Sequence, residues 1–439
     1  MHGDNKRPSV RPSVARATEH GQPGESLLMS RRRFLYGAIG IGAIAAVGIG
    51  AAALGGSGST GSLTVQALDV PKDALSTLND FTAIEDYGTA VRKIGEFDLP
   101  YGTLVWANDT SIAACLLPTE SGSPLAQVAL LHLGSGSYDT VLEKAAGAED
   151  GFEIYDVRAN STGIIWTEAN ILQGAWRVYS STVSGGSIGE PALLEEGGSI
   201  YETPTIAITD TRAIWQVNPK ETEGDGSGET TEEPPAARLM SATHAGADIA
   251  TLFESNRRMA TPPYVYGSTV TIAPRLDSGA YYQLTNLDAA TAEVRDTVTL
   301  PRAITPVEAG YGDTGFMFSF PDIYNYDKAI SNLGTYAPRE KANGNYNAAK
   351  WFDFTRTPTA APAWCDGLLI VKSTYAVCGV DLSAGTYFAI DVENGADTYG
   401  EYLASTGADD SFVTYTNIDH TPVGEQRIHA CRVKVWTRA

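Results

Sequence analysis

The residues of this sequence that could do acid–base chemistry are carboxylates spread along the chain. Four of them lie within or next to short apolar runs that predict β-strands: Asp109, Asp156, Glu308 and Asp366. Two carboxylates that a fold brings together can act as general acid and general base in the cleavage of a glycosidic or similar bond. These four are far apart in sequence, so their chemistry depends on a fold that collects them in one central space.

Cysteine and histidine do not occur in a metal-ligand pattern. The four cysteines all lie in expected strands, and none has a CxxC spacing: Cys115, Cys365, Cys378 and Cys431. Cys365 and Cys378 fall in the first and third strands of one expected unit, so a direct disulfide would need a different register. His132 and His244 take nearly equivalent third-strand positions, where packing explains them. No phosphate loop, nucleophile elbow or calcium loop occurs, and the sequence assigns no metal, no cofactor and no catalytic residue.

Two tryptophans recur at the same place in neighbouring units. Trp166 and Trp215 each stand in the expected second strand of a unit. A pair of aromatic rings could form a platform for a carbohydrate, but an aromatic residue at a fixed strand position more often packs one sheet against the next. The sequence therefore favours packing for both residues.

The elements that must position these side chains are repeated strands. A β-run, a turn of small residues and a second β-run recur at intervals of 43 to 61 residues. The equivalent positions in successive units are Leu133, Val183, His244, Leu287, Leu333, Leu382 and Trp436. Self-similarity of this length with about four strands per unit predicts a β-propeller, because a ring of sheets buries both faces of each sheet against its neighbours. We therefore expect an all-β fold, a seven-bladed β-propeller over residues 87–439.

The last unit is one strand short. It ends after its expected third strand in "RIHACRVKVW", near the C-terminus. The segment Thr89 to Leu99, just before the first unit, has the composition of a strand and is free to supply the missing one. We expect it to be the outer strand of the last blade and to tie the two ends of the chain together. Over about 350 positions, at class level, the repeats resemble the WD-repeat and TolB-like propellers, although the diagnostic dipeptides of those classes are missing.

An uncharged stretch near the N-terminus follows a run of arginines. Residues 34–54 carry no charge and are long enough, at about 1.5 Å per residue, to cross a membrane as a helix. The preceding residues resemble the twin-arginine translocation (Tat) motif in every defined position: Ser30, Arg31, Arg32, Phe34 and Leu35. Tyr36 departs mildly from the family pattern, which prefers lysine there. The resemblance implies recognition by the Tat translocase as a transient partner, and export of an already folded protein.

The expected domain order follows from these segments. Residues 1–29 form a disordered cytoplasmic tail, 30–54 the twin-arginine signal and transmembrane helix, 55–86 a linker, and 87–439 the propeller. A small-x-small sequence at Val65, Gln66 and Ala67 has the form of a processing site, so the exported protein is either released or held in the membrane through residues 34–54. Both forms place it in the cell envelope or outside the cell.

The charge of the expected exported part excludes one class of partner. Residues 68–439 carry 24 basic and 49 acidic residues, a formal charge of −25. Such a body is repelled by phosphate backbones, which argues against nucleic acid as a partner. Residues 220–236, "KETEGDGSGETTEEPPA", are expected to be a solvated loop, either a tolerated insertion or an attractor for a cation or a basic partner.

The sequence is compatible with two functions of different class. The first is a non-catalytic binding or scaffold module at the cell surface that holds an unidentified protein, peptide or glycan on one face of the ring. The second is an exported hydrolase or lyase whose four scattered carboxylates converge on the central channel. The sequence favours the first, because no local catalytic constellation can be assembled from it.

Overall fold

The computed structural model describes residues 65–220, 235–276, 280–324, 328–424 and 426–439. By its contacts the chain divides into two units, Met1–Ala43 and Ile44–Ala439, and every described residue belongs to the second. The expected tail, the expected signal and transmembrane segment, residues 55–64 of the expected linker and residues 221–234 of the acidic segment lie outside the described residues. No helix within the described ranges is long and apolar enough to span a membrane.

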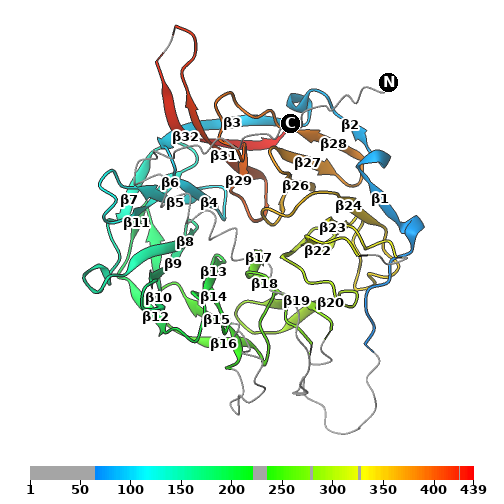
Figure 1. The fold of residues 1–439 in the computed structure, drawn as a ribbon, viewed down its shortest axis with the longest axis horizontal. Helices are drawn as coiled ribbons and strands as arrows, with labels where there is room; N and C mark the ends of the chain where they lie inside the picture. The colour runs from blue at the N-terminus through cyan, green and yellow to red at the C-terminus, as the bar shows by residue number, and fades with distance from the viewer. Residues whose placement is uncertain (1–64, 221–234, 277–279, 325–327, 425) are drawn as a thin grey trace, which may run out of the picture. The chain divides into compact units, whose positions relative to one another are not determined.

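Six sheets are blades built from consecutive strands, arranged around a common centre (Figure 1). The first blade is β4 (Leu104–Ala107), β5 (Ile112–Pro118), β6 (Ala126–His132) and β7 (Tyr138–Leu142). The second is β8 (Glu153–Ala159), β9 (Gly163–Asn170), β10 (Ala175–Ser184), β11 (Ser187–Ile188) and β12 (Ala192–Gly197). The third is β13 (Thr205–Ile208), β14 (Arg212–Val217), β15 (Ala237–Thr243) and β16 (Ala250–Ser255).

The other three consecutive blades follow the same order of strands. The fourth is β17 (Tyr264–Tyr266), β18 (Thr269–Ile272), β19 (Gln283–Asp288) and β20 (Val294–Thr299). The fifth is β21 (Glu308–Gly312), β22 (Gly315–Phe320), β23 (Gly334–Pro338) and β24 (Trp351–Phe354). The sixth is β25 (Ala363–Cys365), β26 (Leu368–Lys372), β27 (Val377–Asp381) and β28 (Thr386–Ala389). A short strand, β30 (Gly407–Asp409), joins the sixth blade at β25.

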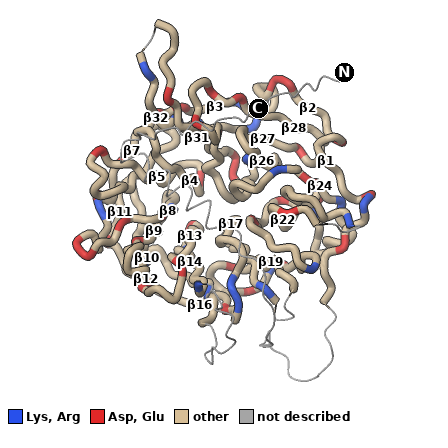
Figure 2. Tube along the Cα trace, in the orientation of Figure 1, with Lys and Arg blue, Asp and Glu red and all other residues tan. Residues whose placement is uncertain are grey.

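The core lies between the blades. The second strands β9, β14, β22 and β26 are buried at every position, whereas the outer strands β7 and β16 are largely exposed. This gradient arises because neighbouring sheets cover both faces of a blade near the centre and diverge toward the rim. The inner strands β13 and β17 carry no charged residue, and in Figure 2 the coloured segments lie mainly on loops and outer strands.

The remaining sheet is assembled from both ends of the propeller, and we call it the closure sheet. It consists of β29 (Tyr402–Leu403), β31 (Ser411–His420), β32 (Ile428–Arg438) and β3 (Val91–Pro100), in that order. β3 pairs antiparallel with β32, from Val91 opposite Arg438 to Pro100 opposite Ala430. The expected pairing of the segment Thr89 to Leu99 with the C-terminal strand is therefore confirmed, and Figure 1 shows the two strands side by side.

Residues 68–90, which we call the strap, run along the outer edges of three blades before they reach β3. The Leu68 N–H donates to the carbonyl of Thr299 on the fourth blade. Two short strands then pair in parallel with outer strands: β1 (Leu75–Thr77) with β24 and β2 (Thr82–Ala83) with β28. Single-turn 3₁₀ helices connect them: η1 (Lys72–Ala74), η2 (Leu78–Asp80) and η3 (Tyr87–Thr89). The strap thus covers sheet edges that would otherwise expose unpaired backbone groups.

The expected fold class needs correction in two respects. Consecutive strands form six blades, not seven. The last strands of the chain, β29, β31 and β32, instead form the closure sheet together with β3 from the other end of the propeller. The described residues contain only 3₁₀ helices, η4 (Ala148–Asp150) being the fourth, and no α-helix. The expected N-terminal helix falls on residues 30–54, outside the described ranges, so the described residues form an all-β propeller without an α-helix.

Candidate functional site

Turns between the first and second strands of the blades bring aspartates together at one end of the central channel. Aspartates stand in or next to these turns at Asp109, Asp210, Asp313 and Asp366, and directly after β30 at Asp410. Neighbouring turns are tied to one another by hydrogen bonds. The Ser161 N–H donates to Oδ2 of Asp109 at 2.6 Å, and Asn160 Nδ2 donates to the Thr209 carbonyl at 3.0 Å. The first three blades therefore hold their turns in a fixed arrangement.

A segment of the chain itself enters the centre of the ring. Residues 404–410, which we call the plug, leave the closure sheet after β29 and return to it at β31. At one side the Ala107 N–H donates to the Ala404 carbonyl, and Asn108 Nδ2 donates to Thr406 Oγ1 at 2.9 Å. At the other side β30 pairs in parallel with β25. Since β4 and β25 are the first strands of different blades, the plug crosses the space that these strands enclose.

Tyr264 of β17 holds the middle of the plug. Its hydroxyl donates to the Pro362 carbonyl at 2.8 Å and accepts from the Gly407 N–H at 3.0 Å. Gly407 has a φ of +83°, and a Cβ at this position would lie 3.1 Å from the Val265 carbonyl oxygen. Only glycine meets both requirements without strain, so the close approach of the plug to β17 depends on this residue.

Asp409, at the end of β30, is the most perturbed carboxylate of this region. Its burial raises the pKa to about 7, and the negative charges of Asp109, Asp410 and Asp210 act in the same direction. Asp109 lies in a turn of the first blade, Asp210 in a turn of the third, and Asp409 at the end of the strand that joins the sixth. We call the four residues Asp109, Asp210, Asp409 and Asp410 the mouth carboxylates. No Lys, Arg or His among the described residues forms an ion pair with Asp409.

The mouth carboxylates can attract positive charge but do not form a metal site. Among the described residues no group of three or more His, Cys, Asp or Glu side chains has the geometry to hold a metal ion. Carboxylates that face each other without a counterion are stabilised by a nearby ammonium or guanidinium group, which also lowers their pKa values. The arrangement is therefore suited to electrostatic binding of a cationic group.

The structure brings together only two of the four carboxylates that the sequence offered for catalysis. Asp109 belongs to the mouth, and Asp366 is exposed nearby, its N–H donating to the Asp409 carbonyl at 3.2 Å. Asp156 and Glu308 are buried in ion pairs, each 2.5 Å from the guanidinium of Arg158 or Arg356 respectively. Arginine side chains thus occupy oxygens of both carboxylates. The expected convergence of all four does not occur.

The aromatic and cysteine side chains belong to the core. Trp166 and Trp215 are 1% and 0% exposed and pack between adjacent blades, so neither offers a ring face to a carbohydrate. All four cysteines are buried and free, in the strands expected from the sequence. Cys365 and Cys378 point into different core clusters and form no disulfide.

Histidines at the two third-strand positions have structural partners. His132 lies at the end of β6 and pairs with Asp139 at 3.0 Å. His244 is buried, and its ring nitrogens lie 3.2 and 3.0 Å from the carbonyl oxygens of Thr162 and Thr209. Burial lowers the pKa of His244. Packing and backbone contacts account for His244, whereas His132 is partly exposed and is held by the Asp139 side chain.

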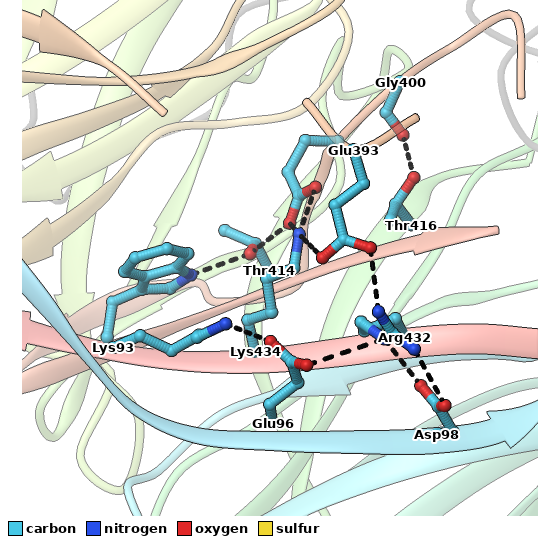
Figure 3. Close-up of polar contacts among 11 residues, drawn as sticks. Lys93, Glu96, Asp98, Glu393, Gly400, Thr414, Thr416, Arg432 and Lys434 are labelled. Atoms are coloured by element: carbon cyan, nitrogen blue, oxygen red, sulfur yellow. Dashed lines mark hydrogen bonds and ion pairs between the residues drawn. The ribbon is translucent and has the colours of Figure 1, made fainter. Parts of the chain in front are cut away.

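A second cluster of charges lies within the closure sheet, and here the charges are paired (Figure 3). Lys434 of β32 is 3.0 Å from Glu401 and 3.1 Å from Glu393, and both Lys434 and Glu401 are almost fully buried. Arg432 continues the cluster, 3.1 Å from Glu393 and 2.8 Å from Asp98 of β3. The cluster thus links β3 to β32 and to the segment before β29.

Hydrogen bonds extend this pairing to neutral groups. Thr414 Oγ1 of β31 donates to Glu401 and accepts from the indole N–H of Trp436 at 2.9 Å. Burial raises the pKa of Glu401, whereas the charge of Lys434 acts to lower it. The ammonium of Lys434 therefore offsets part of the cost of burying this carboxylate.

Comparison with known proteins finds similar solved structures but no family. No family model and no curated protein matches the sequence. Among solved structures, one of two prolyl endopeptidases is similar at 9% identity and a TM-score of 0.47, covering 81% of this chain and 51% of the other. The β-propeller domain of the Trilobed protease from Pyrococcus furiosus is similar at 8% identity and a TM-score of 0.44, covering 78% and 95%. The Dos1 propeller is similar at 13% identity and a TM-score of 0.38, covering 74% and 75%.

By its strand order the chain is a β-propeller, and the solved structures similar to it include a prolyl endopeptidase and the propeller domain of a protease. It spans about half the length of the prolyl endopeptidase that it resembles. Identities this low bear on the fold alone.

Sequence reasoning missed Asp210, Asp409 and Asp410. Each stands in a short turn-like stretch, "ITDTR" or "GADDS", where aspartate is expected for its turn preference alone. A signal was present, since an aspartate or asparagine recurs directly after several first strands. This recurrence cannot be interpreted from the sequence alone, because only the closed ring brings these turn residues close to one another.

Proposed function

We propose that this chain is an exported binding module of the cell surface, and that the mouth carboxylates receive the cationic side chains of a protein or peptide partner. The single observation that supports the proposal is Asp409, whose pKa is raised to about 7 by burial and by three neighbouring carboxylates. A lysine or arginine side chain placed among these groups would remove their mutual repulsion. The overall formal charge of −21 would also steer a basic partner toward the protein.

The alternative, an exported hydrolase or lyase with carboxylates at the channel, has less support. Two of its four residues, Asp156 and Glu308, are occupied by arginines, and the plug fills the space in which a substrate would meet the others. We therefore do not assign catalysis to this chain.

The binding proposal is tested with a nona-arginine peptide and the full chain. Its affinity is measured for the wild type and for the triple variant Asp210→Asn, Asp409→Asn, Asp410→Asn. Asp109 is left unchanged because its carboxylate accepts backbone hydrogen bonds from Ser111, Ile112 and Ser161. The control variant Glu120→Gln, Glu143→Gln, Glu254→Gln removes the same charge from exposed positions away from the mouth.

We expect the mouth variant to weaken binding at least tenfold and the control variant to weaken it by less than threefold, at about 0.1 M salt. Raising the salt to about 1 M should shorten the Debye length from about 10 Å to about 3 Å and remove most of the wild-type affinity. Equal losses in the two variants would mean that only net charge matters, and the mouth would then not be the binding site.

The export part of the proposal is tested separately through Arg31 and Arg32. We expect the double variant Arg31→Lys, Arg32→Lys to remain in the cytoplasm, because the receptor of the twin-arginine route is expected to read the planar guanidinium pair and not charge alone. The measurement is the fraction of protein found outside the cytoplasmic membrane. Normal export of the variant would overturn the assignment of residues 30–54 as a twin-arginine signal.

A further inference from the structure

We propose that a cavity on the outer part of the second blade, which we call the rim cavity, binds a neutral oligosaccharide. Its volume is about 700 Å³, and the side chains that carry the argument are Glu149, Asp150, Phe152, Gln173, Arg177 and Glu196. Sites for small molecules typically have volumes of about 300–1,000 Å³. The inference goes beyond the proposed function, because the rim cavity lies apart from the mouth carboxylates and takes a different class of ligand.

The rim cavity lies at the end of the blade that points away from the channel mouth. The β8–β9 turn reaches the mouth, where the Ser161 N–H donates to Asp109. From this turn β9 runs to the opposite end of the blade, where β10 begins at Ala175. There Arg177 of β10 stands opposite Glu196 of β12. A ligand in the rim cavity therefore leaves the mouth carboxylates accessible.

The wall formed by the connection between the first and second blades is held in place from inside the blade. The buried carboxylate of Glu168 accepts from the N–H groups of Ala146 at 2.7 Å and Gly147 at 3.0 Å. A Cβ on Gly147 would lie 2.7 Å from Nη1 of Arg177 and 2.9 Å from the Phe152 ring. Glycine thus leaves the room in which the guanidinium lies over this ring, 4.3 Å from its centre. The stacking orients the guanidinium before a ligand binds.

The polar side chains of the rim cavity keep capacity for hydrogen bonds to a ligand. Nε of Arg177 is 3.5 Å from Glu196, and Nη2 is 4.0 Å from Asp150. Both distances exceed the roughly 2.7–2.9 Å of a charge-assisted hydrogen bond. Gln173 is exposed in the β9–β10 turn and adds an amide, and Glu149 adds a further exposed carboxylate. The lining therefore presents donors and acceptors side by side.

This lining favours a neutral ligand with several hydroxyl groups. The three carboxylates repel an anion, and an ammonium group offers no acceptor to the N–H groups of Arg177 and Gln173. An apolar ligand finds little surface, since Phe152 is 7% exposed and lies under the guanidinium. A sugar hydroxyl both donates and accepts, so neighbouring hydroxyls can serve a carboxylate and a guanidinium or amide together.

The open form of the rim cavity favours an oligosaccharide over a single sugar. The side chains of Asp150 and Glu196 are 72% and 65% exposed, so the cavity opens to solvent along their edge. An open cleft can hold part of a longer chain, whose remaining units extend along the surface of the blade.

The test is binding of the full chain to immobilised hexasaccharides of glucose, mannose and N-acetylglucosamine. A sulfated hexasaccharide and the nona-arginine peptide serve as anionic and cationic probes. We expect a neutral hexasaccharide to bind, with an affinity that stays within about twofold when the salt rises from about 0.1 M to about 1 M, because the ligand carries no charge to be screened. Binding of none of the three neutral probes would overturn the inference, as would a loss of their binding at high salt.

A pair of variants tests whether the rim cavity is the site. The variant Asp150→Ala, Gln173→Ala removes two exposed polar side chains of the cavity, and the control Asp391→Ala, Gln426→Ala makes the same changes at exposed positions outside it. We expect roughly tenfold weaker binding of the neutral hexasaccharide by the first variant, from two lost hydrogen bonds, and a change of less than about twofold in the control. Equal effects of the two variants, or none of the first, would contradict the assignment.

The inference and the proposed function fail by different results. The cavity variant should leave the binding of nona-arginine unchanged, and the triple variant Asp210→Asn, Asp409→Asn, Asp410→Asn should leave the binding of the hexasaccharide unchanged. Weaker binding of nona-arginine by the cavity variant would show that the rim cavity takes a cation, which overturns the choice of ligand. Weaker binding of the hexasaccharide by the triple variant would move the sugar to the mouth and overturn the choice of site.

Discussion

The closure sheet and the channel mouth both gather carboxylates from distant parts of the chain, but only the closure sheet pairs them with basic side chains. In the closure sheet Glu401 lies 3.0 Å from Lys434 and Asp98 lies 2.8 Å from Arg432. At the mouth the negative charges of Asp109, Asp210 and Asp410 add to the raised pKa of Asp409 instead. The same residue types therefore stabilise one region and leave the other with uncompensated negative charge.

The difference separates a structural role from the binding role that we propose. A buried ion pair offsets its desolvation cost only when both partners are present and hydrogen-bonded, which the closure sheet provides through Thr414 and Trp436. The closure sheet thereby fixes how β3 meets β32. A cluster without a counterion costs stability that an incoming cation can restore. We interpret the mouth as the region available to a partner.

The largest expected effect is on the closure sheet. Glu401→Leu should lower the free energy of unfolding by about 3–5 kcal/mol, because it leaves the buried ammonium of Lys434 with less compensation. Chemical denaturation at pH 7 measures this change. The matched double variant Glu401→Leu, Lys434→Met should recover most of the loss. A double variant as unstable as the single one would show that packing, not charge pairing, holds this sheet.

A smaller effect of opposite sign is expected at the mouth. The triple variant Asp210→Asn, Asp409→Asn, Asp410→Asn should raise the melting temperature by a few degrees at pH 8, where wild-type Asp409 is ionised. At pH 5 the same variant should gain little, because wild-type Asp409 is already protonated there. Calorimetry at the two pH values makes the comparison. A destabilised variant at pH 8 would contradict the idea that these carboxylates repel one another.

The sequence predicted the elements of the propeller better than the features that connect them. Strand repeats leave a clear alternation of apolar runs and turns, and the missing last strand pointed to the pairing of Thr89 to Leu99 with the C-terminal strand. The strap and the plug left no such signal. Both are positioned partly through backbone groups, for instance the Leu68 N–H on the Thr299 carbonyl and the Gly407 N–H on the Tyr264 hydroxyl, which impose no side-chain period. The apolar residues that they bury, such as Leu68, Phe81 and Ala404, are too widely spaced to show one.

The candidate site was harder to predict for a related reason. Asp156 and Glu308 are carboxylates in or next to first strands of blades, as Asp109 is, yet arginines at 158 and 356 pair with them. Asp156 pairs with an arginine two positions along its own strand, whereas the partner of Glu308 is 48 positions away. A single sequence does not encode the second kind of pairing as a local pattern.

The most direct test of the account is a measurement of the Asp409 pKa by carbon NMR, with the signal assigned by comparison with Asp409→Asn. The titration is made on the wild type alone and in the presence of the nona-arginine peptide. The account predicts a pKa of about 7 without the peptide, and a value closer to the ordinary aspartate range with it, since bound guanidinium groups favour the ionised form. A pKa near 4 in the free protein, or a pKa near 7 that saturating peptide does not change, would contradict the claim that the mouth is an unpaired acidic site for a cationic partner.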